Sequence, residues 1–96
     1  MAEKRSVTVR IAGEEHTIRA SAEPEYTKAC ARFVDERIQQ IRGSAGLIEG
    51  HKAAILAALS IADECFQAQE ELERARAELA GRVDELAEKL EASLPG

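Results

Sequence analysis

The chain has 96 residues, which allows one compact domain at most. Its formal net charge of −5 at pH 7 is unevenly distributed, because residues 51–96 carry 5 basic and 10 acidic side chains whereas residues 1–50 are balanced. The acidic second half argues against nucleic acid as a main partner, since neutralisation of phosphates supplies most of the affinity in such complexes.

The chain lacks the sequence signs of a membrane or secreted protein. No apolar run approaches the length of about 18 residues that a membrane span needs, and residues 1–5 are polar, with no apolar signal segment after them. We therefore expect no membrane insertion and a cytoplasmic location. Cys30 and Cys65 lie far apart and match no metal-ligand spacing, so we expect reduced thiols, with a disulfide or redox role as the alternative.

The first predicted element is a β-hairpin. Residues 7–11 alternate apolar and polar side chains, as in a half-buried strand, and residues 15–19 alternate again. Between them, residues 12–14 form the turn, where Gly13 can adopt a positive φ. A lone hairpin is marginally stable in water, so this one must pack on another element.

An amphipathic helix is predicted next. Ser21 or Glu23 can cap its start, and Pro24 suits its first turn. Residues 43–46 are rich in helix breakers and end it. The apolar positions follow the three- and four-residue spacing of about four to five helical turns. They are Tyr26, Ala29, Cys30, Phe33, Val34, Ile38 and Ile41.

A long helix follows, from about Gly50 to Leu94, with no proline and only Gly81 as an interruption. At about 1.5 Å per residue it would measure about 65–70 Å, more than a small head can cover. We expect its first half to pack within a head dimer and its second half to form a coiled coil. The side chains predicted to mediate self-association are Ile55, Leu59, Ala62, Phe66, Leu72, Leu79, Val83, Leu86 and Leu90.

The predicted fold class is therefore α+β, mainly α. Residues 1–49 form a small head of a β-hairpin and one amphipathic helix, and residues 50–96 form the long C-terminal helix.

The seam of the coiled coil varies in quality. From Leu72 onward the apolar residues are spaced by 7, 4, 3 and 4, which places them at the a and d positions of a heptad repeat. Gln69 and Arg76 occupy a positions in the same frame, and a polar residue there weakens the coil while it selects register. We therefore expect the stretch from Leu79 to Leu90 to be a second interface, distinct from the one near the head.

The sequence shows no catalytic, cofactor or metal-binding pattern. It has no glycine-rich phosphate loop and no paired cysteine ligands, and His16 and His51 match no recognised spacing. Only three aromatic side chains are present, which leaves little to line a ligand pocket. We therefore predict a protein that is not an enzyme and that uses no cofactor or metal.

Four cations of the first helix are candidate partner contacts. Arg37 falls in the middle of the apolar face, where it either contacts a partner or packs its stem in the core, with its guanidinium on a carboxylate across a subunit boundary. Lys28, Arg32 and Arg42 fall on the opposite, polar face. They form either a solvated surface or a docking surface for an acidic partner.

Residues 7–13, the second strand, the amphipathic helix and the segment Ala57–Glu64 that leads into the heptads resemble the bacterial ZapA family. The resemblance extends from about Ser6 to Leu90. Its most specific part is Ala57–Glu64, where Ser60 replaces the asparagine that is common in the family.

The resemblance implies a cell-division scaffold without catalytic activity. Such proteins bind the tubulin-like GTPase FtsZ, form head dimers that join tail to tail into tetramers, and cross-link or bundle FtsZ filaments at midcell, which stabilises the Z-ring. The matching candidates for FtsZ contact are Arg37 and Arg42, with Lys28 and Arg32 as neighbours. The alternatives are a generic coiled-coil adaptor with a different protein partner and a small DNA-associated protein.

Overall fold

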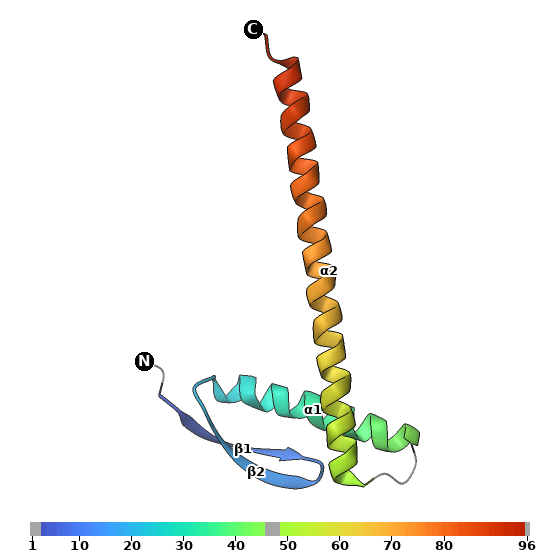
Figure 1. Cartoon of the computed structure of the whole chain (residues 1–96). Coiled ribbons are helices and arrows are strands. Elements are labelled where there is room, and N and C mark those ends of the chain that lie inside the picture. Colours follow the sequence, from blue (N-terminus) through green and yellow to red (C-terminus); the bar gives the residue numbers. More distant parts are fainter. Residues whose placement is uncertain (1–2, 46–48, 96) are drawn as a thin grey trace. The chain divides into compact units, whose positions relative to one another are not determined.

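The computed structural model describes residues 3–45 and 49–95. In chain order its elements are β1 (Arg5–Ile11), β2 (Glu14–Ala20), α1 (Pro24–Ala45) and α2 (Gly50–Ser93) (Figure 1). This confirms the predicted fold class of an antiparallel hairpin, a first helix and a long second helix. The chain divides into two units, Met1–Ile61 and Ala62–Gly96, so the first turns of α2 belong to the same unit as the hairpin and α1.

The hairpin turn contains two residues rather than the three that the sequence suggested. Ala12 has φ 55° and Gly13 has φ 79°, and Glu14 already pairs with Ile11 as the first residue of β2. Two successive residues with positive φ match the right-handed twist of the strands. The positive φ of Gly13 was predicted, whereas Ala12 adopts it at a steric cost that glycine avoids.

A side chain of α1 anchors this turn. Oδ1 of Asp35 accepts a hydrogen bond of 2.8 Å from the backbone N–H of Ala12, at a partly buried position. A charged acceptor makes this hydrogen bond stronger than one between neutral groups. Asp35 therefore holds the turn against α1 and offsets part of the strain at Ala12.

We expect Asp35→Ala to lower the free energy of unfolding by about 1–2 kcal/mol, because it leaves the Ala12 N–H without its acceptor. Asp35→Asn retains a side-chain oxygen at the same position and is expected to lose less. Urea unfolding followed by circular dichroism, at one fixed protein concentration, compares the three proteins. Equal midpoints for Asp35→Ala and the parent chain would show that the bond does not stabilise the turn.

The head core consists of two small clusters. Val7 and Val9 of β1 are 4% and 5% exposed and pack with Ala31 of α1. Ile38 of α1 is 1% exposed and packs with Ala53 and Ala57 of α2, which are fully buried. Alanine at positions four residues apart lets the α2 backbone approach α1 closely. The α2 residues that fill the core of a single copy are thus the small ones.

The core covers the inner face of the hairpin only in part. Val7 and Val9 are buried by α1, but their register partners Ile18 and His16 on β2 are exposed. On the outer face, the hydroxyls of Thr8 and Thr17 lie 3.2 Å apart. The sheet therefore has one strand under α1 and one that is largely open to solvent.

The start of α1 follows a simple local rule. α1 begins at Pro24, and the carbonyl of Glu23 accepts the first helical hydrogen bond, 3.0 Å from the N–H of Thr27. The helix continues through Gly43 and ends at Ala45, within the stretch predicted to stop it. Gly46 of that stretch lies outside the described residues. Over the part of the chain that the structure describes, neither helix is long and apolar enough to cross a membrane.

Candidate functional site

The candidate functional features are surfaces for other chains. In the two described stretches, 3–45 and 49–95, no three side chains of histidine, cysteine, aspartate or glutamate come together in a way that could hold a metal ion. The predicted site residues are charged and apolar side chains of α1 and α2.

The first surface is an apolar groove between α1 and the start of α2. Ala29, Cys30, Phe33 and Val34 of α1 and Ile61 of α2 line it. Phe33 is 50% exposed in a single copy. An exposed apolar hollow of this kind is typical of a protein interface.

The predicted self-association residues Ile55 and Leu59 belong to the same unit and are also exposed, at 48% and 63%. Ala62 and Phe66 are exposed as well, at the start of the second unit. Exposure of so many apolar side chains in one copy is consistent with burial against another chain.

The second surface is an apolar stripe on the C-terminal half of α2. Its side chains are each at least half exposed in a single copy, and their spacing follows the a and d positions of a heptad repeat. They are Leu72, Leu79, Val83, Leu86 and Leu90.

Two ion pairs lie along the C-terminal half of α2. Arg82 and Glu78, four residues apart in sequence, form an ion pair in which Nη2 and Oε1 lie 2.7 Å apart. Arg76, at an a position, lies 3.8 Å from Glu73 in the preceding turn. A guanidinium paired along its own helix can stay at the rim of a seam, where it remains hydrated.

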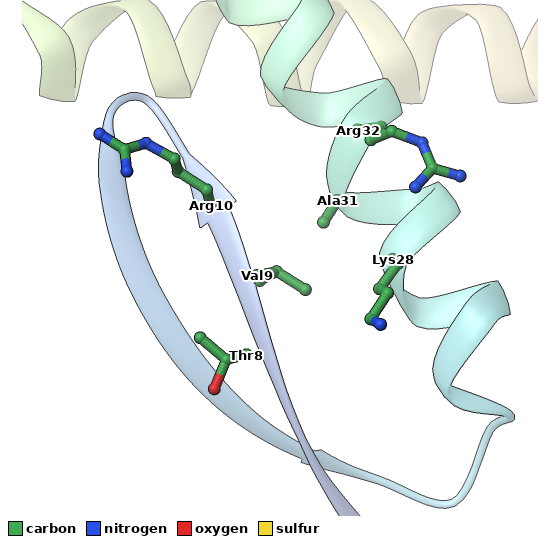
Figure 2. Close-up of a pocket in the computed structure, with 6 residues that line it drawn as sticks. All are labelled: Thr8, Val9, Arg10, Lys28, Ala31 and Arg32. Carbon is green, nitrogen blue, oxygen red and sulfur yellow. The ribbon is translucent and has the colours of Figure 1, made fainter.

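The four predicted cations do not form one surface. Lys28 and Arg32 lie together beside β1, where they line a groove with Thr8, Val9 and Ala31 (Figure 2). Arg10 lines the same groove. Arg10 was not among the predicted site residues, because strand alternation identifies an exposed arginine but does not identify the helix beside which the strand will lie.

Arg37 lies on the α2 side of α1. Its Nη1 donates a hydrogen bond of 2.9 Å to Oγ of Ser60, and its guanidinium carbon lies 5.3 Å from the centre of the Phe33 ring. Both interactions fix the side chain in the head and hold it beside the apolar groove. The position of Arg37 therefore suits two roles, a contact between two copies of this chain and a contact with a different protein.

Arg42 lines a separate hollow with the hairpin turn and the start of α2. Its other polar lining residues include Glu14, His16 and His51. Mixed charges in this hollow give it a weaker preference for an acidic partner than the groove at Lys28 and Arg32 has.

The chain is similar to several known proteins over nearly its whole length. Residues 7–90 match the family model described as cell division protein ZapA. A cell division protein ZapA from Geobacillus kaustophilus (strain HTA426) is 32% identical over 81 residues, which cover 84% of this chain and 89% of that protein.

Two solved structures share the fold. A structure described as an unknown conserved bacterial protein from Pseudomonas aeruginosa PAO1 has a TM-score of 0.75 at 27% identity, over 92% of this chain and 98% of that one. A ZapA mutant dimer from Geobacillus stearothermophilus has a TM-score of 0.64 at 32% identity, over 80% and 90% of the two chains. Because the family model and these relatives span both the head and the long helix, the chain belongs to the ZapA family of cell division proteins.

Proposed function

We propose that this protein is a non-enzymatic scaffold that binds FtsZ filaments and cross-links or bundles them at the division site in the cytoplasm. The observation that carries the proposal is the family match over residues 7–90. The surfaces of the chain support it, because they suit contacts with other proteins rather than a reaction.

Self-association is the first part of the proposal. A second copy covers the apolar groove at Phe33, Ile61 and the neighbouring exposed side chains, and gives a head dimer. The part of the stripe from Leu79 to Leu90 then joins two dimers through their long helices. The related Geobacillus stearothermophilus structure is described as a dimer, and the heptad spacing of the stripe supports the second interface.

FtsZ contact through the head is the second part. Lys28, Arg32 and Arg42 are cationic side chains on the surface of a chain whose net charge is −5, so they form local sites for an acidic partner. Arg37 is assigned a supporting role in this contact, because it is held by Ser60 and Phe33.

Bundling follows from valency. A body with several heads binds a filament through one head and then makes later contacts intramolecularly, which can raise the overall affinity by about 10²–10⁴ over a single head. Heads that engage two different filaments hold those filaments side by side. The number of heads per particle therefore decides whether the protein decorates filaments or bundles them.

Co-sedimentation with purified FtsZ tests the proposal. FtsZ is polymerised with GTP, and the pellet is measured with and without this protein, while light scattering in the same buffer gives the mass of the protein alone. We expect the protein to enter the pellet and to increase the pelleted filament mass. An oligomer that stays in the supernatant would reject FtsZ as the partner and favour an adaptor for another protein.

In the same assay, we expect Arg42→Glu to raise the half-saturating concentration by roughly tenfold, because it places a carboxylate opposite an acidic surface. Lys4→Glu is the matched control, since it makes the same charge change at an exposed position that lines none of the described grooves. Mass and helical content should stay constant in both variants. Equal binding by the two would remove Arg42 from the contact surface.

A further inference from the structure

The outer edge of β1 has no strand partner among the described residues, since the sheet has two strands and β1 pairs with β2 alone. Ile11 and Glu14 flank the two-residue turn, so they form a hydrogen-bonded pair. Along an antiparallel hairpin, hydrogen-bonded pairs alternate with non-hydrogen-bonded pairs. Thr8 and Arg10 belong to the second kind. Their backbone N–H and C=O groups therefore point away from β2, toward the open edge.

This edge forms one wall of the groove in Figure 2, which has a volume of about 190 Å³. Val9 and Ala31 form its apolar floor, and Lys28 and Arg32 stand on consecutive turns of α1 as the opposite wall. The guanidinium groups of Arg10 and Arg32 are exposed and point away from the groove on its two sides.

The groove is basic although the chain is acidic. Of the described residues that line it, three are cations and none is an anion. One of these cations forms an ion pair within α1: Nζ of Lys28 lies 3.5 Å from Oε1 of Glu25, and both side chains are exposed. Such a pair is weak and exchanges readily for another carboxylate.

We propose that an extended acidic segment of the partner adds to β1 as a third strand in this groove. The inference rests on the proposed function and specifies how the head holds its partner. Backbone hydrogen bonds to Thr8 and Arg10 supply affinity, and carboxylates that meet Lys28 and Arg32 supply specificity, as in other cases of strand addition beside a helix.

The spacing of the two cations indicates the sequence pattern of the segment. Lys28 and Arg32 are four residues apart on a helix, which is a rise of about 6 Å. Residues i and i+2 of an extended strand point to the same side and are about 6.6–6.8 Å apart. An acidic residue at every second position therefore fits both cations at once.

Two occupants from the protein itself fit less well. Pairing of β1 with β1 of a second copy would bring the same three cations of both copies to one edge, which is repulsive. The acidic half of this chain is helical from Gly50 to Ser93, so its backbone groups are already used and it cannot add as a strand.

Two proline substitutions at register partners test the inference. Thr8 and Thr17 are the same residue type, face each other in one non-hydrogen-bonded pair, and share a hydroxyl contact of 3.2 Å. Proline at either position leaves the ladder between the strands intact but removes an outward N–H. Thr8→Pro blocks the edge beside α1, and Thr17→Pro blocks the edge of β2.

The readout is co-sedimentation with GTP-polymerised FtsZ, with thermal unfolding of each variant as a check on folding. We expect Thr8→Pro to raise the half-saturating concentration at least tenfold and Thr17→Pro to change it less than twofold. If the two variants bind equally while the parent chain pellets, strand addition is wrong and the FtsZ assignment stands. If the parent chain does not pellet, both the assignment and the inference are overturned.

Hydrogen–deuterium exchange on the parent chain provides a test that needs no variant to fold. Addition of FtsZ filaments should slow exchange in peptides that cover residues 5–11 and leave residues 14–20 unchanged. Protection of both strands, or of neither, in a bound complex would overturn the inference.

Discussion

Val83→Glu is expected to lower the oligomeric state of the protein by one step, from a pair of dimers to a single dimer, without unfolding the head. Val83 is 57% exposed in one copy and sits at an a position near the middle of the apolar stripe. In a paired coil that position is buried, and an unpaired carboxylate there costs several kcal/mol. The dissociation constant of the tail interface should rise by at least about a hundredfold.

Ala77→Glu is the matched control for this prediction. It introduces the same charge on the same helix, but position 77 lies at b in the heptad frame and stays in water. Light scattering across a range of protein concentrations should give half the mass for Val83→Glu and the full mass for Ala77→Glu. An unchanged mass for Val83→Glu would reject the idea of a second interface in the tail.

Ile38→Ala is expected to give the largest loss of head stability, about 2–5 kcal/mol. Ile38 is the one large side chain, among those described, that is almost completely buried, and it contacts Ala53 and Ala57 of α2. These small neighbours cannot move in to fill the cavity, because their backbone is part of a long helix. The head should therefore open before the C-terminal half of α2 melts.

Ile18→Ala controls for the chemical change, because Ile18 is 38% exposed whereas Ile38 is 1% exposed, so its truncation removes less buried surface. We expect its cost to stay below about 1 kcal/mol. Urea unfolding at a fixed protein concentration, followed by protease cleavage within the head, separates the two variants. A similar cost for both would mean that the contact of Ile38 with α2 contributes little to stability.

Local patterns predicted the secondary structure well for physical reasons. Alternation in residues 7–11 reports which side of a strand is buried, and Pro24 marks a helix start because its missing N–H is not needed there. The turn was predicted one residue too long. Ala12 has no sequence signal for positive φ, and its conformation is fixed by Asp35, 23 residues away.

The candidate site was predicted less completely, because a helical wheel gives angles but not neighbours. It identified Lys28 and Arg32 as one polar face but could not show that Arg10 joins them, or that Arg42 lies in another hollow. A helical wheel also could not show which apolar residues of α2 pack inside one copy and which remain exposed for contact with another chain. In α2 the alanines 53 and 57 fill the core of one copy, whereas the larger Ile55 remains exposed.

The bond between Asp35 and Ala12 also has a consequence for strand register. Side chains alternate along a strand, so a slip of one residue would turn Val7 and Val9 outward and drive Thr8 and Arg10 into the core. The polar side chains on the outer face of the two strands do not by themselves prevent such a slip. Because Asp35 accepts a hydrogen bond of 2.8 Å from the backbone N–H of Ala12, a slipped hairpin would lose this contact, and the bond therefore favours the observed register.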